Sequence, residues 1–561
     1  MTARSLIDSV KYLPLSQANE QLKILCGVTH FLDGTENSSL SFGKNLRPQS
    51  DQEEYGDWQT NINLAVAVCQ MLKRQGVRPK VIIEPTCGKG NFIFAALQVF
   101  DSIEDVYGIE IYKPYLDQLK LDILQHYIES PDSRRVSFHF YNQSIFDFDM
   151  SQLEMPTQGR EVLVIGNPPW ATNSKLREIG SENLPFKSNF KKVKGLEAIT
   201  GKGNFDICES ICSQMIGFLS TKKASHLAML IKNSVAKNIM YEQRNCRFAA
   251  SSISQYNIDA KKEFGVSVAA SLLCIWFDGS ASRVCQVKDF YTMKSVRVYG
   301  WANDCFVADM VSYKNSEFID GRSQLTWWSG MKHDCAKVME LKRVGDRYVN
   351  GLGECVDIED DVVYPLLKSS DIKGDSISSV QKYVIVTQKG TSEDTDWMKD
   401  SCPKAYKYLS QHANLLDERR SVIYRNRPRF CIFGIGSYSF KPYKVVISGL
   451  YKQTRFSLVK AIEDKPVMLD DTCYLLGFDR LDDALAAQCV LNSKLVQSFI
   501  NSLLFIDAKR VINKELLMRI DVLEAARYLA KENLCDGIHG VESFIAMLKS
   551  KALPKQYALF G

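Results

Sequence analysis

Asn167-Pro168-Pro169-Trp170 is the most specific chemical feature of the sequence. It directly follows residues 161–166, an apolar run with the composition of a buried strand. Two consecutive prolines remove two backbone N–H groups and stiffen the loop, so its carbonyl groups keep a fixed direction. The Asn167 side-chain oxygen and the Pro168 carbonyl can each accept one hydrogen of an amino group, and Trp170 offers a ring for stacking. The combination is typical of a site for a planar ring that bears an exocyclic amine.

Such an amine, for example N6 of adenine, is a poor nucleophile because its lone pair is delocalised into the ring. Two acceptors that hold its hydrogens draw the nitrogen towards a tetrahedral form and free the lone pair. The nitrogen can then attack an electrophilic methyl group in one step, without a metal or a covalent intermediate. Positioning and hydrogen bonding supply most of the rate of such a step. The tetrapeptide therefore predicts methyl transfer to an amine.

The second chemical feature is a glycine-containing turn, Glu84 to Asn91, which follows an apolar strand-like run. Gly88 and Gly90 let the backbone pass close to a ligand, and the helix that follows offers free N–H groups at its N-terminus. A dinucleotide-binding turn would carry a third glycine where this chain has Ile93. The carboxylate of Glu84 would also repel a pyrophosphate, but it suits the cationic end of a ligand that bears an amino acid. The turn therefore disfavours NAD.

Gly108-Ile109-Glu110 lies near the end of the next predicted strand, residues 105–111. An acidic residue about 20 positions after a glycine turn is well placed to accept hydrogen bonds from ribose hydroxyls. An adenosine without phosphate, together with an amino-acid head, describes S-adenosylmethionine. We therefore expect this cofactor and no metal.

The elements that must position these residues alternate between strands and helices up to about residue 277. Such alternation predicts an α/β fold with a doubly wound, Rossmann-like sheet. After residue 290 the segments become shorter and richer in aromatic residues, which predicts a second domain of mixed α+β structure. The predicted strands are 80–83, 105–111, 136–141, 161–166, 225–231 and 267–276; the predicted domains are an N-terminal extension 1–50, a catalytic domain 51–290 and a C-terminal domain 291–561.

The composition excludes several other classes of protein. The chain has 561 residues, of which 45% are hydrophobic and 24% charged, as in ordinary globular proteins of two to four domains. The longest apolar run, Val266–Phe277, is too short to cross a bilayer, which takes about 20 residues. The 16 cysteines form no CxxC pair, which favours free thiols in a reducing compartment. We expect a cytoplasmic protein without a membrane partner.

The net charge of +5 conceals a concentrated basic window at residues 401–460. This window holds twelve Lys and Arg residues against Asp417 and Glu418, so it carries +10, and the rest of the chain carries −5. A concentration of this kind suggests a polyanionic partner, although a solvated basic face without a ligand would look the same. The candidates for phosphate contacts are Arg425, Arg427, Arg429, Lys441, Lys444, Lys452 and Arg455.

In the order of its motifs, the sequence resembles the gamma class of amino-methylating DNA methyltransferases, such as the TaqI adenine-N6 enzyme. The motifs are Tyr55-Gly56-Asp57-Trp58-Gln59-Thr60, the glycine turn, Gly108-Ile109-Glu110, the tetrapeptide and Lys262-Glu263-Phe264-Gly265-Val266. The resemblance implies that Phe264 packs on the flipped target base, facing Trp170 across the adenine. It also implies that Thr60 helps to hold the methionine part of the cofactor. In the family an Asp reads the cofactor's adenine, where this chain has Ser144; Asp147 could substitute for it.

The resemblance gives a complete list of expected site residues. The catalytic residues are Asn167, Pro168, Pro169, Trp170 and Phe264, and the cofactor-binding residues are Thr60, Glu84, Pro85, Gly88, Gly90, Glu110, Ile111, Ser144, Ile145 and Asn167.

Looser similarity continues into the second half, over roughly residues 50–530 in total. Residues 364–372 (YPLLKSSDI), 417–421 and 438–451 look like parts of a TaqI-type target-recognition domain, and residues 507–512 resemble its closing helical part. The resemblance implies a site-specific enzyme that flips adenine out of double-stranded DNA and modifies it at N6. It further implies a restriction–modification system, with a cognate restriction endonuclease as a partner that acts on the same site.

Other functions share the tetrapeptide. Cytosine-N4 methylation uses the same geometry, although Ser is commoner than Asn there. RNA adenine-N6 and protein glutamine methyltransferases also carry it, but they do not need a large domain that resembles a DNA reader. A non-catalytic DNA-binding protein on a methyltransferase fold is disfavoured by the intact Glu84, Glu110 and Asn167.

Overall fold

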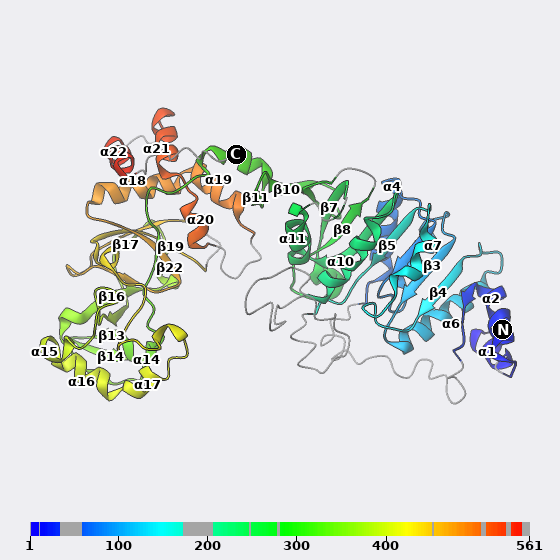
Figure 1. Cartoon of the computed structure of the whole chain (residues 1–561), viewed down its shortest axis with the longest axis horizontal. Coiled ribbons are helices and arrows are strands. Elements are labelled where there is room, and N and C mark those ends of the chain that lie inside the picture. Colours follow the sequence, from blue (N-terminus) through cyan, green and yellow to red (C-terminus); the bar gives the residue numbers. More distant parts are fainter. Residues whose placement is uncertain are drawn as a thin grey trace. The chain divides into compact units, whose positions relative to one another are not determined.

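The computed structural model describes residues 2–10, 12–33, 59–171, 206–245, 248, 250–277, 281–450, 454–505, 512–534 and 540–551. The chain divides into two compact units, Met1–Phe306 and Val307–Gly561 (Figure 1). In the part of the chain that is described, no helix is long and apolar enough to span a bilayer.

The first unit is built on a large sheet with the strand order β1-β4-β3-β2-β5-β6-β8-β7-β9-β10-β11. The strands are β1 (Val28–Thr29), β2 (Val81–Glu84), β3 (Asp105–Ile109), β4 (Ser137–Tyr141), β5 (Val162–Gly166), β6 (Ser225–Lys232), β7 (Ser252–Ile258), β8 (Ala270–Trp276), β9 (Val284–Asp289), β10 (Ser295–Ala302) and β11 (Cys305–Val307).

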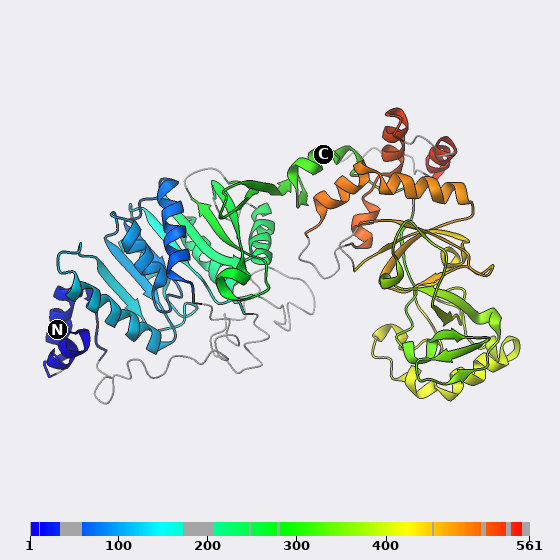
Figure 2. The ribbon, with the colours of Figure 1, turned by 180° about the vertical axis from the view of Figure 1, so that it is seen from behind.

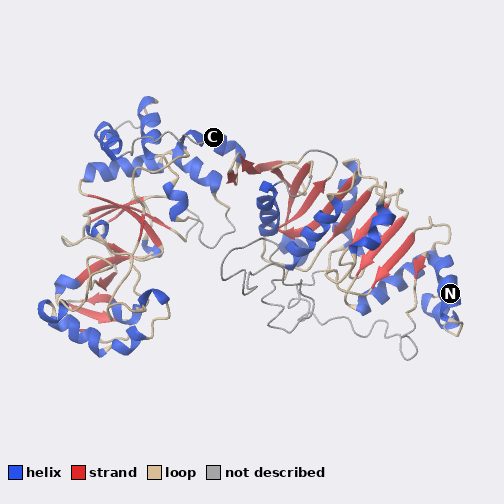
Figure 3. Ribbon diagram, in the orientation of Figure 1, coloured by secondary structure: helices blue, strands red, loops and turns tan. Residues whose placement is uncertain are grey.

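The strands from β1 to β6 run parallel to their neighbours, and β8 is antiparallel to both β6 and β7. Strands β2 and β5 are buried along their whole length because helices cover both faces of the sheet. Figure 3 shows these helices in front of and behind the strands. The predicted doubly wound α/β fold is confirmed, and the reversed β8 makes the sheet mixed.

Two groups of helices cover the sheet. Helices α4 (Ile62–Arg74), α5 (Asn91–Val99) and α6 (Lys113–Glu129) share one hydrophobic core with α1 (Ala3–Val10) and α2 (Leu15–Cys26). Helix α10 (Ile207–Leu219) packs against β6, and it lies in front of the sheet in Figure 1, whereas α4 lies in front in the reverse view of Figure 2.

The described part of the predicted extension 1–50 is integral to this unit. Leu22 of α2 and Val28 of β1 are fully buried, and β1 pairs with β4 at the edge of the sheet. The sheet also continues past the predicted boundary at residue 290, because β9, β10 and β11 add strands to it, and the two units meet between Phe306 and Val307.

The second unit contains two smaller sheets with helices around them. One sheet has the order β12-β22-β19-β20-β17, and the other has the order β15-β14-β13-β18-β16-β21. The strands are β12 (Trp328–Ser329), β13 (Glu340–Val344), β14 (Arg347–Asn350), β15 (Cys355–Val356), β16 (Val363–Leu367), β17 (Ser376–Ile377), β18 (Lys382–Ile385), β19 (Tyr443–Ser448), β20 (Ser457–Lys460), β21 (Met468–Leu469) and β22 (Cys473–Phe478).

The described helices of the second unit fall into two groups along the chain, α13–α17 before residue 418 and α18–α22 after residue 480. They are α13 (Met310–Lys314), α14 (Ala336–Met339), α15 (Met398–Ser401), α16 (Pro403–Gln411), α17 (Ala413–Asp417), α18 (Leu481–Asn492), α19 (Lys494–Leu503), α20 (Lys514–Met518), α21 (Val522–Lys531) and α22 (Val541–Lys551).

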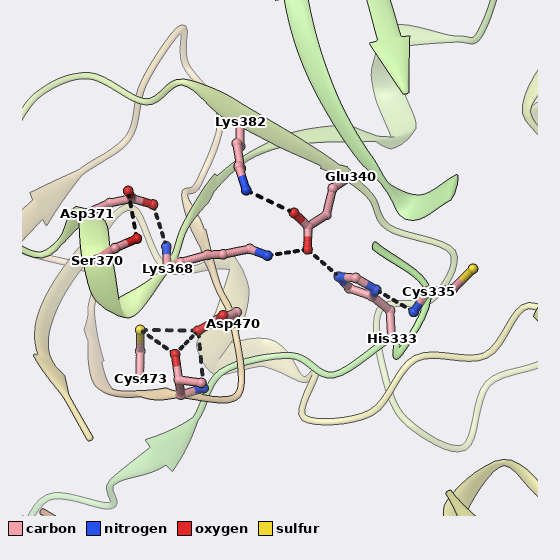
Figure 4. A network of polar contacts seen from close by, with 10 residues as sticks. His333, Cys335, Glu340, Lys368, Ser370, Asp371, Lys382, Asp470 and Cys473 are labelled. Atoms are coloured by element: carbon pink, nitrogen blue, oxygen red, sulfur yellow. Dashed lines mark hydrogen bonds and ion pairs between the residues drawn. The ribbon is translucent and has the colours of Figure 1, made fainter. Parts of the chain in front are cut away.

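A polar network joins the two sheets of this unit (Figure 4). The carboxylate of Glu340 receives contacts from His333, Lys368 and Lys382. Ser369 directly follows Lys368 in the chain. Its hydroxyl donates to the Thr472 carbonyl at 2.9 Å, in the loop that runs from β21 into β22. The segment 364–372, which the sequence singled out, therefore connects the two sheets.

Candidate active site

The glycine turn after β2 is held in a left-handed backbone conformation at two points. Gly88 has φ +52° and Gly90 has φ +78°. A Cβ on Gly88 would lie 3.0 Å from Oε1 of Gln59, and one on Gly90 would lie 2.3 Å from Cδ1 of Leu119. Both positions require glycine, because the backbone conformation is strained for other residues and the neighbouring side chains approach closely.

Glu110 fixes the other side of this turn. Its Oε2 accepts a hydrogen bond from the Gly88 N–H at 2.9 Å, and its Oε1 accepts one from the Tyr112 N–H at 2.7 Å. Each carboxylate oxygen can accept a second hydrogen bond, so the group can hold the turn and still receive ribose hydroxyls. Ile111 beside it is 42% exposed and offers an apolar surface for a base.

Glu84 ends β2 as a buried carboxyl group, only 3% exposed. Among the described residues its Oε2 has no hydrogen-bond partner. Burial raises the pKa of Glu84 well above its usual range, the negative charge of Glu110 adds to this shift, and the N–H of Ile93 opposes it. A buried acceptor without a protein partner is costly unless a ligand satisfies it, and an ammonium group would do so.

Thr60, two residues before the start of α4, lies against the same turn. The Asn91 side chain donates to the Thr60 carbonyl at 2.6 Å. The hydroxyls of Thr60 and Thr86 are buried, and within the described residues neither has a hydrogen-bond partner. Two hydroxyl groups and one carboxyl group are a donor set that fits the amino-acid part of S-adenosylmethionine.

Ser144 and Ile145 lie in the turn that follows β4. The Ser144 hydroxyl accepts a hydrogen bond from the Phe146 N–H at 3.2 Å, and Ile145 is buried. Asp147 is exposed on the same turn. Asn142, which the sequence analysis missed, donates to the carbonyls of Glu110 and Ile111 at 2.9 and 3.1 Å and so ties the ends of β3 and β4 together.

The tetrapeptide leaves the carboxyl end of β5. Pro168 is buried, whereas Asn167, Pro169 and Trp170 are partly exposed. The Trp170 indole N–H donates to the Leu230 carbonyl of β6 at 3.2 Å, so the neighbouring strand holds the ring in place. Gly166 lies next to Glu84, since a Cβ there would be 3.4 Å from Glu84 Cγ. The tetrapeptide and the glycine turn are therefore neighbours in the fold.

Phe264 ends the short helix α12 (Ala260–Phe264) and contacts Trp170 directly. The two ring centroids are 5.2 Å apart with an angle of 68° between the planes. This is an edge-to-face contact, which leaves no room for a third ring. The predicted pairing of these two aromatic residues is present, but the rings are in contact here rather than on opposite sides of a gap for a base.

These residues meet because β2, β3, β4 and β5 are parallel and their carboxyl ends share one edge of the sheet. Ligands of open α/β sheets bind at this edge. The sequence analysis missed the residues that β6 places there, of which Lys232 forms an ion pair with Asp206 at the start of α10. In the described residues, no cluster of three or more His, Cys, Asp or Glu side chains could hold a metal ion.

The predicted phosphate contacts in the second unit lie in three different environments. Arg429, Lys441 and Arg455 form ion pairs with Asp417, Asp479 and Asp375, respectively. Arg425 and Arg427 are exposed, and no described carboxylate pairs with either. Lys452 and residues 55–58 and 507–511 lie outside the described part of the chain.

The prediction is wrong for Lys444, whose side chain does not reach the surface. Lys444 is 1% exposed in β19, where all residues but the first are buried, and its ammonium donates to the Lys441 carbonyl at 2.7 Å. Burial lowers the pKa of Lys444 to about 7. The charge count of the sequence could not show that β19 is covered on both faces.

An aromatic and basic feature of the second unit was also missed. Trp328 stacks on Tyr438 with ring centroids 4.3 Å apart, and the Lys514 ammonium lies 4.9 Å from the centre of the Trp328 ring. Trp328 is 37% exposed. Three distant segments form this feature, so no local pattern in the sequence could have revealed it.

The strand order β4-β3-β2-β5-β6-β8-β7 with the reversed β8, and a ligand-binding edge beside the glycine turn, define the class I S-adenosylmethionine-dependent methyltransferase fold. Over 479 residues the chain is 42% identical to the Type II methyltransferase M.NspV from Nostoc sp., and the match covers 85% of this chain and 98% of that protein. The chain therefore belongs to the Type II methyltransferases, the methyltransferases of restriction–modification systems.

Other comparisons are weaker. No family model matches the chain. Among solved structures it is similar to the Type IIL restriction-modification enzyme MmeI in complex with DNA, with 11% identity, a TM-score of 0.46 and coverage of 90% of this chain and 72% of that chain. It is also similar to the type IIG restriction endonuclease BpuSI, with 13% identity, a TM-score of 0.37 and coverage of 88% and 60%. Because both TM-scores are low, the assignment rests on M.NspV.

Proposed function

We propose that the chain is a site-specific DNA methyltransferase of the gamma, TaqI-like class. It transfers a methyl group from S-adenosylmethionine to N6 of an adenine flipped out of double-stranded DNA. It acts as the modification enzyme of a restriction–modification system, with a cognate restriction endonuclease that acts on the same site. The family of M.NspV supports the methyltransferase activity, and the tetrapeptide supports the choice of an exocyclic amine.

The observation that carries the proposal is the position of the tetrapeptide beside the buried carboxyl group of Glu84. Gly166, directly before Asn167, packs against the Glu84 side chain. Glu84 binds the ammonium of the cofactor, Thr60 and Thr86 lie beside its amino-acid part, and Glu110 receives the ribose hydroxyls. When bound, S-adenosylmethionine supplies an electrophilic methyl group at this edge of the sheet.

The chain's own residues activate the amine. The Asn167 oxygen and the Pro168 carbonyl each accept one hydrogen of N6, which draws the nitrogen lone pair out of conjugation with the ring. Trp170, held by the Leu230 carbonyl, stacks on one face of the base. Phe264 packs on the other face after it has moved away from Trp170.

The two units of the chain have different roles in the proposed reaction. The unit Met1–Phe306 is the catalytic part, and the unit Val307–Gly561 is the target-recognition part that binds the duplex. Flipping a base costs a few kcal/mol, which contacts to the duplex must offset. Arg425 and Arg427 are the exposed cations best suited to phosphate contacts, because no described carboxylate neutralises them.

The proposal is tested by sequencing modified bases in the DNA of cells that express the protein, with Asn167→Ala as the control. We expect N6-methyladenine at one recurring sequence, and far less of it with the variant. N4-methylcytosine at a recurring site would replace adenine with cytosine as the target. Unmodified DNA from cells that contain the folded protein would overturn the proposed function.

A further inference from the structure

Phe264 lies on a helix too short to hold its own position. Helix α12 has five residues, and the Asp259 side chain begins it by accepting hydrogen bonds from the Lys261 and Lys262 N–H groups at 3.1 Å. Gly265, with φ +74°, ends it. An isolated helix of this length is unstable in water, so contacts from outside must fix the direction of the Phe264 ring.

One exposed side chain makes three contacts to this helix. The Tyr291 hydroxyl donates to Oε1 of Glu263 at 2.8 Å and accepts a hydrogen bond from the Asp259 N–H at 3.3 Å. The Lys262 ammonium lies 4.9 Å from the centre of the Tyr291 ring. Tyr291 thus contacts α12 at both ends: at Asp259, the residue that begins it, and at Glu263, next to its last residue.

The tyrosine itself stands on a rigid base. It lies in the tight turn between β9 and β10, where Asp289 Oδ1 accepts hydrogen bonds from the N–H and the hydroxyl of Thr292, both at 2.7 Å. The neighbouring residue, Phe290, is buried, and its N–H donates to the Asn257 carbonyl of β7 at 3.0 Å. The turn is therefore anchored to the strand that leads into α12.

We propose that Tyr291 is a positioning residue that sets the place of Phe264 against the target base. This inference rests on the proposed function, because it assigns Phe264 to the flipped adenine. Tyr291 touches neither base nor cofactor and acts through Glu263 and the backbone of α12.

The protonation state of Tyr291 suits this role. Partial loss of water around its hydroxyl raises the pKa of Tyr291 to about 12, and the hydrogen bond to Glu263 adds to the shift. The hydroxyl therefore remains a donor throughout the neutral range. A donor to a carboxylate is stronger than one to a neutral acceptor, which makes this contact the main link of the three.

The experiment is a double-mutant cycle on the single-turnover rate of methyl transfer, with Tyr291→Phe and Phe264→Ala alone and together. We expect Tyr291→Phe to slow transfer roughly threefold to tenfold in the unaltered chain, the range for the net contribution of one hydrogen bond. In the Phe264→Ala background it has no further effect, because the ring that it positions is gone. Equal effects of Tyr291→Phe in both backgrounds would overturn the inference, since a general structural defect adds independently.

Two controls make the result specific. Tyr241→Phe removes a hydroxyl from another exposed tyrosine of the same unit, for which no hydroxyl hydrogen bond is described, and should leave the rate unchanged. Glu263→Gln keeps an acceptor for Tyr291 and should retain most of the rate, whereas Glu263→Leu should reproduce the loss. A retained rate in Glu263→Leu would contradict the proposed link.

A second measurement separates this inference from the proposed function. In the protein without DNA, hydrogen exchange of residues 259–266 should become faster in Tyr291→Phe and remain unchanged in Tyr241→Phe. Unchanged exchange in both variants would overturn the positioning role even if the enzyme methylates adenine. The other outcome is faster exchange in Tyr291→Phe in a protein that transfers no methyl group to DNA. It would support the contact between Tyr291 and α12, but it would exclude the proposed function and the role of Phe264.

Discussion

Two carboxyl groups of this chain lie in opposite surroundings. Glu84, at the functional edge of the first unit, has an oxygen without a hydrogen-bond partner in the described residues, and burial raises its pKa. Glu340, half-buried at the start of β13 in the second unit, lies among His333, Lys368 and Lys382. Burial alone would raise the pKa of Glu340, but the hydrogen bonds from His333 and Lys368 outweigh it and lower the pKa to about 2.

The difference separates a site that needs a ligand from a site that the protein completes itself. A buried acid without a cation reduces the stability of the fold, and such a group persists where a ligand supplies the missing charge. A half-buried acid that Lys368 and Lys382 hold in its ionised form contributes stability while it keeps its charge, and its removal leaves those cations without their partner. The same change from Glu to Gln should therefore have opposite signs at the two positions.

The largest effect is expected at the functional edge. Asn167→Ala should lower turnover roughly a hundredfold or more, because one of the two acceptors for the amine is lost, while cofactor binding persists. Single-turnover methyl transfer and cofactor titration measure the two properties separately. Asn414→Ala, which removes an exposed amide in the second unit, is the matched control. Undiminished turnover in Asn167→Ala would remove the catalytic assignment.

The completed network should matter for stability instead. Because the pKa of Glu340 falls from 4.5 to about 2 on folding, its charge contributes stability above about pH 4.5 that is lost as the pH falls towards 2. Glu340→Gln should lower the free energy of unfolding at neutral pH, and by progressively less below pH 4.5. Urea denaturation at several pH values measures this. A difference that does not depend on pH would mean that the shape of the side chain, and not its charge, is important.

The sequence was informative where function depends on consecutive residues at strand ends. Strands β2, β3 and β5 were predicted to within two residues, because a strand covered on both faces is a continuous apolar run. Since they are parallel, their following turns necessarily meet at one edge. The approach of Glu84, Glu110 and Asn167 could therefore be predicted without a structure.

Long-range pairing could not be predicted. Arg455 pairs with Asp375, 80 positions away, and Lys441 pairs with Asp479, 38 positions away, so the charge of a sequence window overestimates the charge of the surface. The reversed direction of β8 and the place of β1 at the sheet edge depend on packing and leave no local pattern. The contact between Tyr291 and α12 also joins separate segments.

Glu84→Gln should have the opposite effect to Glu340→Gln on the protein without cofactor. An acid whose pKa is raised by folding destabilises the protein as the pH rises above the ordinary value of 4.5, so the amide should increase the free energy of unfolding at neutral pH. The same variant should bind S-adenosylmethionine about tenfold more weakly, because a charge-assisted hydrogen bond to the ammonium is lost.

The pH dependence of cofactor binding sharpens this test. Glu84 must lose its proton to bind an ammonium, so affinity in the unaltered protein should increase with pH as the raised pKa of Glu84 is passed. Glu84→Gln should show no such increase. Calorimetry below the raised pKa of Glu84, in buffers of different ionisation enthalpy, should also detect proton release on binding, and only in the unaltered protein. Equal proton release by both proteins would exclude Glu84 as the ammonium acceptor.

The smallest effects are expected within the basic window, where exposed and buried cations can be compared directly. Replacing both Arg425 and Arg427 with Ala should weaken duplex binding several-fold and reduce the slope of log affinity against log salt by about two, one for each phosphate contact. Lys444→Met removes an equal charge from the same window but from a buried position. Binding isotherms at increasing salt should therefore show no change of slope for Lys444→Met.

Lys444→Met should change stability instead of binding. Folding lowers the pKa of Lys444 from 10.5 to about 7, so the charged side chain destabilises the fold progressively as the pH falls from 10.5 to 7, and fully below that. Methionine should therefore increase the free energy of unfolding, most strongly below pH 7. A Lys444→Met protein with a smaller salt slope and unchanged stability would place this ammonium at the DNA surface, and the distinction between exposed and buried cations would be wrong.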